Sequence, residues 1–250
     1  MEADGLAALA VAARGSGLRV PAPLALSGLE SEAVLLLPWL ALDAPGGSDA
    51  ALAWRNLGAG LAALHRHSLE RRCCGEDHPE RFGWPRDNAI GAGEQVNGWC
   101  DAWGRFFAER RLAPQLERLQ RREGAMPGAA ALLDRVPQWL ASHPAEPCLV
   151  HGDLWSGNAG LGPDGAGVIF DPAVYRGDRE VDLAMARLFG GFPAAFFAGY
   201  EAAWPLAAGH RERVPLYNLY HLLNHANLFG GSYGQQARQL IGELLRQPPI

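Results

Sequence analysis

The sequence predicts an α+β protein of two parts, a small N-terminal part that contains strands and a larger, mainly helical C-terminal part. Three observations predict this division. An extended segment and a strand-like apolar run lie within residues 20–37. Apolar residues recur at helical spacing in most segments after residue 41. Residues 148–171 contain two short apolar runs that each end in a carboxylate. We therefore divide the chain into residues 1–40 and 41–250.

The composition limits the kinds of protein that this chain can be. Hydrophobic residues make up 48% and charged residues 20% of 250 residues, which is typical of a soluble globular protein. A net charge of −5 argues against a nucleic-acid partner, since phosphate binding needs a basic surface. No apolar run has the length of a membrane span, and the acidic start does not resemble a signal peptide. We expect a cytoplasmic protein whose cysteines are free thiols, at Cys73, Cys74, Cys100 and Cys148.

The N-terminal part is predicted to contain one helix followed by two extended segments. The helix covers residues 2–13 and ends before Gly15. Residues 20–26, broken by Pro21 and Pro23, form an extended segment at a sheet edge, and residues 32–37 form a strand that ends at Pro38. Two strands and one helix cannot cover both faces of a sheet, so we expect that further elements complete it.

The C-terminal part is predicted to be built from helices. His65 and His67, near the end of the first of them, are expected to contact the helix terminus and solvent. The aromatic stripe that includes Trp103 and Phe106 is expected in the core. Residues 71–97 are polar and glycine-rich and are expected to be irregular. The predicted helices cover residues 49–66, 99–120, 129–142, 180–189, 193–204, 214–229 and 235–246.

The stretch from residue 148 to residue 171 carries the candidate chemistry. Its first apolar run is followed by His151 and Asp153, Asn158 comes five residues later, and the second run ends at Asp171. Asp153 is placed to accept a proton from a hydroxyl, while Asn158 and Asp171 offer the hard oxygen ligands that Mg²⁺ prefers. His151 is expected to support the loop by hydrogen bonds to the backbone.

Several longer motifs resemble those of the fructosamine kinase (ketosamine-3-kinase) family, which shares the phosphotransferase fold of aminoglycoside kinases, choline kinases and, distantly, protein kinases. The resemblance covers residues 2 to about 245. It is carried by residues 151–158 (HGDLWSGN), 169–173 (IFDPA), 175–185 (YRGDREVDLAM), 188–192 (LFGGF) and 216–225 (LYNLYHLLNH), and earlier by Asn88, Ile90, Gly91, Gln95, Asn97, Trp99 and Trp103.

The resemblance implies a fold, a reaction and a set of site residues. It implies a protein-kinase-like fold of two lobes, in which ATP and Mg²⁺ lie between a nucleotide-binding lobe, of which residues 1–40 are a remnant, and a helical lobe. Asp153 is then the base that deprotonates the sugar 3-hydroxyl of a ketosamine, free or attached to a protein. Asn158 and Asp171 hold Mg²⁺. A hinge that contacts adenine consists of Leu36, Leu37, Pro38 and Trp39.

Three further residues receive roles from the same resemblance. Asp182 is expected to tie down the catalytic loop. Trp155 is expected to pack against the sugar, with simple packing of the loop as an equal alternative. His225 is assigned to a wall of the sugar pocket, although hydrogen bonds between helices are the alternative explanation for the polar side of that helix.

The chain departs from the family pattern at its beginning. Family members start with further strands that carry a glycine-rich loop and a lysine, and Glu2 matches the glutamate that pairs with this lysine. All 22 basic residues of the present chain are arginines. We expect a start site placed too late or an incomplete chain, rather than a naturally short protein. If the chain is complete, weak ATP affinity, little kinase activity and a sheet edge that pairs with another copy are expected.

Two classes of function therefore remain open. The first is an ATP-dependent kinase of fructosamines or related ketosamines, with an aminoglycoside or choline type of substrate as a lesser alternative. The second is a kinase-like binding module with weak catalysis. The oligomeric state and the natural amine of the substrate do not follow from the sequence.

Overall fold

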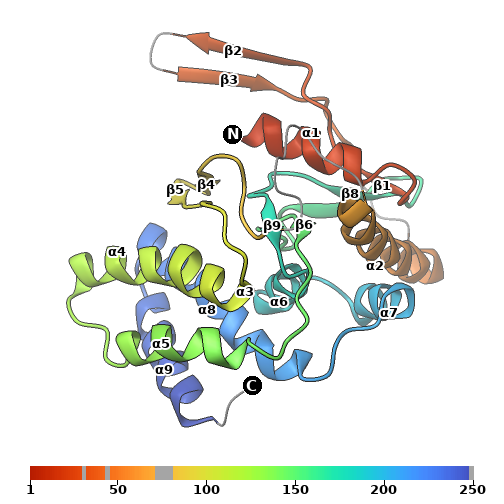
Figure 1. Ribbon diagram of the computed structural model, residues 1–250. Coiled ribbons are helices and arrows are strands. Elements are labelled where there is room, and N and C mark those ends of the chain that lie inside the picture. Colours follow the sequence, from red (N-terminus) through yellow and green to blue (C-terminus); the bar gives the residue numbers. More distant parts are fainter. Residues whose placement is uncertain (30–31, 43–45, 71–80, 248–250) are drawn as a thin grey trace.

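The N-terminal helix α1 (Glu2–Ala12) lies across the small sheet whose last strand leads to Asp171 (Figure 1). The computed structural model describes residues 1–29, 32–42, 46–70 and 81–247. Leu6 and Leu9 of α1 are fully buried, as the apolar spacing of this helix predicts. After Gly15 and Gly17, strand β1 (Leu18–Arg19) pairs in parallel with β8 (Gly167–Ile169). The beginning of the chain is thereby joined to a strand that lies 149 positions further along the sequence, from Leu18 to Gly167.

The hairpin of β2 (Ala25–Leu29) and β3 (Glu32–Leu36) extends away from the other elements, above α1 (Figure 1). Its two strands are antiparallel, with Leu26 opposite Leu35. The extended segment was expected at residues 20–26, but the strand begins at Ala25. Pro21 and Pro23 lack the backbone N–H group that a strand ladder requires, which explains the later start.

The long helix α2 (Gly47–Glu70) packs along α7 (Ala194–Ala203) on one side of the molecule (Figure 1). Leu57, Leu61 and Leu64 are buried, as predicted. Leu52, in the first part of the same helix, is exposed. Five residues separate Leu52 from Leu57, which places the two side chains about 140° apart around the helix axis, so Leu52 lies outside the buried face to which Ala53 belongs.

A pair of short strands and a three-stranded sheet carry the two loops that contain Asp153 and Asp171, and they meet near the centre of the molecule. Strand β6 (Cys148–Val150) pairs with β9 (Tyr175–Gly177), and β8 lies between β1 and β7 (Ala159–Leu161). A separate hairpin is formed by β4 (Asn88–Ile90) and β5 (Gly93–Gln95). Strands β4, β5, β7 and β9 were not predicted, and β4 and β5 correct the expectation that residues 71–97 are irregular; residues 71–80, with Cys73 and Cys74, lie outside the described part.

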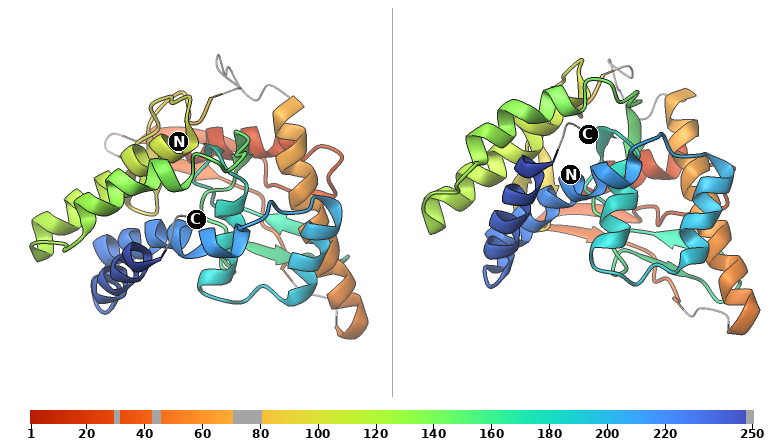
Figure 2. Two further views of the ribbon diagram at one scale, coloured as in Figure 1. Left: turned by 60° about the horizontal axis from the view of Figure 1, so that its bottom comes forward. Right: turned by 90° about the horizontal axis from the view of Figure 1, so that it is seen from below.

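The remaining helices form a bundle on the side opposite the β2–β3 hairpin (Figure 1), and Figure 2 shows this bundle from below. Trp103, Phe106 and Phe107 are buried in its core, as the aromatic stripe predicts. Within the described residues no helix is both long and apolar enough to cross a membrane. The bundle consists of α3 (Trp103–Phe106), the π-helix η1 (Phe107–Leu112), α4 (Ala113–Glu123), α5 (Ala129–Trp139), α6 (Glu180–Leu188), α8 (His210–Phe229) and α9 (Tyr233–Arg246).

Candidate active site

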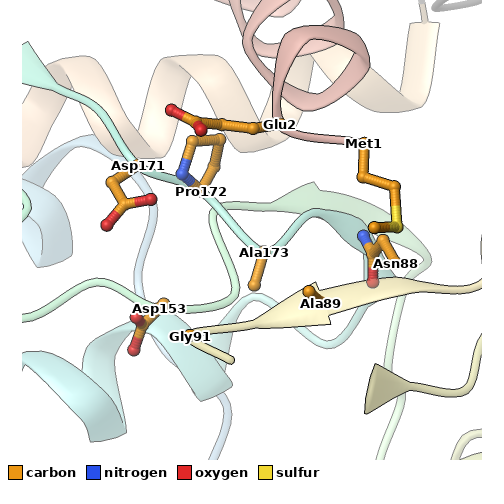
Figure 3. A pocket seen from close by; sticks show the side chains of 9 residues that line it. All are labelled: Met1, Glu2, Asn88, Ala89, Gly91, Asp153, Asp171, Pro172 and Ala173. Carbon is orange, nitrogen blue, oxygen red and sulfur yellow. The ribbon is translucent and has the colours of Figure 1, made fainter. Parts of the chain in front are cut away.

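The loops that follow β6 and β8 place Asp153 and Asp171 in the lining of one cavity (Figure 3). The volume of the cavity is about 180 Å³. Glu2, at the start of α1, lies over the same space and faces Asp171 (Figure 3). The wall opposite α1 is formed by the β4–β5 hairpin, through Ala89 and Gly91. Three carboxylates from three separate segments of the chain therefore share one small cavity.

The charge of this cavity suits a divalent cation. None of the nine described residues that line it has a basic side chain, while three have carboxylates. Burial, and then the charge of Asp171, raise the pKa of Glu2 above its ordinary value. Carboxylate oxygens are preferred ligands of Mg²⁺, and a cation would relieve the repulsion among them. The donor set therefore fits Mg²⁺.

Asn158 connects the two acidic loops. Its side-chain nitrogen donates to the backbone oxygen of Asp153 at 3.0 Å, to Oδ2 of Asp153 at 3.3 Å and to the backbone oxygen of Asp171 at 3.3 Å. Because the nitrogen is used in this way, the amide oxygen is the atom that Asn158 can offer to a cation. The structure thus brings together Asp153, Asn158 and Asp171, as the motif predicts.

The carboxyl group of Asp153 has an unusual proton affinity. Burial, followed by the charges of Asp171 and Asp182, raises its pKa to about 7, against the opposing effect of the hydrogen bond from Asn158. A carboxylate with a pKa near neutrality accepts a proton more readily than an ordinary aspartate does. The environment therefore makes Asp153 a competent base at neutral pH.

The backbone of Asp171 has an uncommon conformation. It is the only non-glycine residue in the described part of the chain with a positive φ, which is 53°. Such a conformation costs free energy for a residue with a side chain and is found preferentially at functional sites. The strain is an independent reason to place function at Asp171.

Asp182 and His151 hold the loop that carries Asp153. Oδ2 of Asp182 accepts the backbone N–H of His151 at 2.7 Å, and Oδ1 accepts that of Gly152 at 2.9 Å. Burial lowers the pKa of His151, which keeps its ring neutral. Its Nε2 lies 2.9 Å from the backbone oxygen of Phe170 and its Nδ1 accepts the N–H of Asp153 at 3.3 Å. These contacts are the ones that the expected supporting roles require.

His65 was assigned to solvent and the end of its helix, and this prediction is wrong. The side chain is fully buried between α2, α6 and α7. Its Nε2 lies 3.1 Å from Oδ2 of Asp182, and its Nδ1 lies 2.8 Å from the hydroxyl group of Tyr200. The hydrogen bond from His65 helps to hold the pKa of Asp182 below its ordinary value, although burial acts in the opposite direction.

The other predicted site residues lie outside the lining of this cavity. Leu36 is the last residue of β3, Leu37, Pro38 and Trp39 follow it, and the side chain of Trp39 is almost fully exposed. Their role as a hinge stays a prediction. Trp155, on the same loop as Asp153, is 40% exposed and could be reached by a ligand. His225 packs against Phe189, with ring centroids 4.6 Å apart, and its role also stays a prediction.

A set of buried amides beside the cavity was not assigned any role from the sequence. Asn88, Gln95 and Asn97 lie on and after the β4–β5 hairpin, and their side chains bond to one another. The amides of Asn88 and Gln95 also reach the segment that follows Asp171. No pattern in the sequence indicates that these amides are buried, since polar residues on both sides of Val96 are typical of an exposed face. Their partners, 78 and 86 positions away, could not be read from the sequence.

The fold and these acidic loops define a protein-kinase-like phosphotransferase. An aminoglycoside phosphotransferase shares the fold, with a TM-score of 0.61 and 18% identity over 98% of this chain and 84% of that one. The sequence profile of the fructosamine kinase family matches residues 1–247, and the chain belongs to that family.

Two relatives illustrate how close the similarity is. A protein of Synechocystis named as a probable ketoamine kinase is 46% identical over 245 residues, which cover 98% of this chain and 78% of the relative. The crystal structure of a Haemophilus somnus protein assigned as a fructosamine-3-kinase matches with a TM-score of 0.82 and 29% identity, over 98% of this chain and 78% of the other. The chain is therefore a kinase by family, and the predicted fold class is confirmed.

Proposed function

We propose that this protein transfers a phosphoryl group from ATP to the 3-hydroxyl of a ketosamine, either free or attached to a protein. The observation that carries the proposal is the pairing of Asp153 and Asp171 in one acidic cavity, with Asn158 bonded to both loops. Phosphoryl transfer requires a base for the attacking hydroxyl and ligands for a cation that neutralises the phosphates. Each requirement has a residue of suitable chemistry in this cavity.

Asp153 acts as the base in this proposal. Its carboxylate accepts the proton of the sugar hydroxyl as the oxygen attacks the terminal phosphorus of ATP, and the bond from that phosphorus to the oxygen it shares with ADP breaks. The N–H of Asn158 fixes Oδ2 of Asp153, so the carboxylate is oriented before the substrate arrives. The raised pKa of Asp153 favours proton uptake near neutral pH.

Asp171 and the amide oxygen of Asn158 would hold Mg²⁺. The ion supplies charge neutralisation at the phosphates when it is bound. Glu2 faces the same space and adds a third carboxylate to the cavity. The fructosamine kinase family supports a ketosamine as the substrate, and Trp155 and His225 are the candidates for contact with it.

A kinase-like binding module with little turnover is the second candidate. The observation in its favour is the sequence itself, which contains no lysine, together with the absence of basic side chains among the nine described residues of the cavity lining. Phosphate chains in kinases are usually neutralised by a lysine as well as by metal ions. Isothermal titration with MgATP separates the candidates, because tight binding together with turnover would exclude the second.

The decisive experiment compares Asp153→Asn with the wild type, with ATP, Mg²⁺ and fructosyl-lysine as substrates. Loss of the base should lower kcat by about 10² to 10⁴-fold. The matched control is Asp101→Asn, which makes the same change at a side chain that is 83% exposed. Phosphorus NMR of the product identifies the esterified hydroxyl. Equal rates for Asp153→Asn and the wild type would remove Asp153 from the proposed role.

A further inference from the structure

The segment that follows Asp171 is held by side-chain amides from the β4–β5 hairpin. Nε2 of Gln95 donates to the backbone oxygen of Ala173 at 3.0 Å, and Nδ2 of Asn88 donates to the backbone oxygen of Val174 at 2.8 Å. Ala173 and Val174 are both buried. Two carbonyl groups within three residues of a strained aspartate are therefore satisfied by amides and not by a strand ladder.

The orientation of each amide is fixed by a donor behind it. Oδ1 of Asn88 accepts from Gln95 at 2.8 Å and from Asn97 at 2.7 Å, so its nitrogen must face Val174. Oε1 of Gln95 accepts the hydroxyl proton of Tyr220 at 2.8 Å, so its nitrogen must face Ala173. An amide that accepts on its oxygen side has only its nitrogen to offer on the other. The hydrogen bonds thus run in one direction, toward the segment after Asp171.

The chain of donors begins at a buried guanidinium group. Nη2 of Arg111 donates to Oδ1 of Asn97 at 2.6 Å, and Nη1 donates to the backbone oxygen of Val96. Arg111 is fully buried, and its guanidinium carbon lies 3.8 Å from the ring centroid of Tyr175. It cannot lose its proton, so it can only donate. Arg111 therefore sets the direction of the hydrogen bonds through Asn97 and Asn88.

The helix that carries Arg111 departs from α-helical geometry at this point. Residues Phe107–Leu112 form a π-helical turn between α3 and α4. Such turns are rare and occur frequently at functional sites. Burying a guanidinium group costs free energy, and its contacts here are with oxygen atoms and aromatic rings, which compensate part of that cost.

We propose that Asn88, Gln95 and Asn97, with Arg111 and Tyr220 as their outer donors, position Asp171 for binding of the divalent cation. These are positioning residues, since they act on the Ala173 and Val174 carbonyl groups next to Asp171. The proposal rests on the metal role given to Asp171 in the proposed function. It adds that the β4–β5 hairpin, which also lines the cavity, determines how well Asp171 presents its carboxylate.

The test replaces Gln95 by Met, which preserves the size of the side chain and removes its hydrogen bonds. Binding of Mn²⁺ alone is measured by electron paramagnetic resonance, and hydrogen exchange is measured over residues 171–175. Loss of such a supporting partner typically weakens metal binding by about tenfold. We expect a shift of this size and faster exchange of residues 171–175. Tyr220→Phe, which removes only the donor to Gln95, should shift both quantities less, in the same direction.

The matched control is Asn227→Leu. The amide nitrogen of Asn227, like that of Gln95, donates to one carbonyl oxygen and one side-chain amide oxygen, both in Gln115. It should lower the melting temperature by a similar amount while leaving Mn²⁺ binding and the exchange of residues 171–175 unchanged. An equal effect of Asn227→Leu and Gln95→Met on Mn²⁺ binding would show that only general destabilisation is observed, and would overturn the proposal.

A fourth variant, Asp171→Asn, separates the two proposals from each other. If Asp171→Asn leaves Mn²⁺ binding unchanged, the metal role of Asp171 in the proposed function fails. Faster exchange of residues 171–175 in Gln95→Met would then still support the amide network as the support of this segment. Unchanged exchange in Gln95→Met overturns the network, whatever Asp171→Asn does.

Discussion

At the scale of single residues, the buried carboxyl group of Asp153 lowers the stability of the folded protein when it is ionised. In the unfolded chain its pKa is close to the ordinary value of 3.8, whereas in the fold burial and the charges of Asp171 and Asp182 raise it to about 7. Between these values the folded state holds a proton that the unfolded state has lost. The free energy of unfolding therefore falls as the pH rises from about 4 to about 7.

Asp153→Asn should be more stable than the wild type at pH 8, because the amide carries no charge to bury. We expect a gain of about 2 kcal/mol, half of what the full shift corresponds to, since the carboxyl group is partly exposed. The gain should largely disappear at pH 3, where the wild-type group is mostly protonated in both states. Urea unfolding at the two pH values without metal measures it. A gain that is equal at both pH values, or also present in Asp101→Asn, would contradict this explanation.

Position 152 requires glycine both for its positive φ and for the close approach of Ala173, and the variants Gly152→Ala and Gly15→Ala separate the two effects. Its φ is 81°, and a Cβ atom placed on it would lie 2.1 Å from the backbone oxygen of Ala173. Gly15 has nearly the same φ, 80°, and a Cβ atom there would meet nothing within 4 Å. Gly15→Ala should therefore cost only the backbone strain, about 1 kcal/mol. Gly152→Ala should cost about 3 kcal/mol or more and reduce turnover. Equal losses of stability in the two variants would mean that the loop moves to make room for the added Cβ atom.

At the scale of elements, the buried hydrogen bonds around Asp182 join α2, α6 and α7 beneath the loop that carries Asp153. Arg179 donates to the hydroxyl of Tyr200 at 3.3 Å, which leaves the hydroxyl proton free for Nδ1 of His65. Nε2–H of His65 then donates to Asp182, which in turn accepts the backbone of the loop. A neutral histidine with its proton on Nε2 satisfies every one of these partners.

Replacement of His65 should therefore affect both stability and turnover. His65→Leu removes one hydrogen-bond donor from the buried Asp182 carboxylate and leaves the hydroxyl proton of Tyr200 without its acceptor, which should cost about 2–3 kcal/mol and lower kcat. His67→Leu is the control, since His67 lies on the same helix, is half-buried and makes one long contact, of 3.4 Å, with the Ala12 carbonyl. It should cost less than about 1 kcal/mol. Thermal unfolding and steady-state kinetics measure the losses of stability and of kcat in both variants. Equal losses in His65→Leu and His67→Leu would mean that His65 only fills space.

The limits of sequence-based prediction are clearest at the same scale. Helices of ten or more residues were predicted because their apolar spacing repeats several times, as in α2 and α9. Strands β4, β5, β7 and β9 have three residues each, too few for an alternating pattern to be recognised. Asp153, Asn158 and Asp171 could be found because one continuous motif carries them. The contact between His65 and Asp182 joins residues 117 positions apart, and no local pattern indicates it.

At the scale of the whole molecule, stability should be unevenly distributed between the central strands and the β2–β3 hairpin. The hairpin extends away from the other elements (Figure 1), and Leu24, Leu26 and Leu36 are more than half exposed. A two-stranded hairpin without a packed face is marginally stable in water. Strand β6, by contrast, is fully buried, and the N–H of Leu149 is bonded to the hydroxyl oxygen of Ser68.

Hydrogen exchange measured by mass spectrometry should therefore separate these regions. We expect the amides of β2 and β3 to exchange at least about a hundredfold faster than those of residues 148–152, because opening the hairpin disrupts few buried contacts. Within the described residues β2 and β3 pair only with each other, and their outer edges and exposed apolar side chains favour pairing with a second copy of the chain. Such pairing would slow exchange in β2 and β3 at high protein concentration and restore it on dilution, without changing residues 148–152. Slow exchange in β2 and β3 that persists on dilution of a monomer would contradict the prediction, since it would mean that the hairpin is stable on its own.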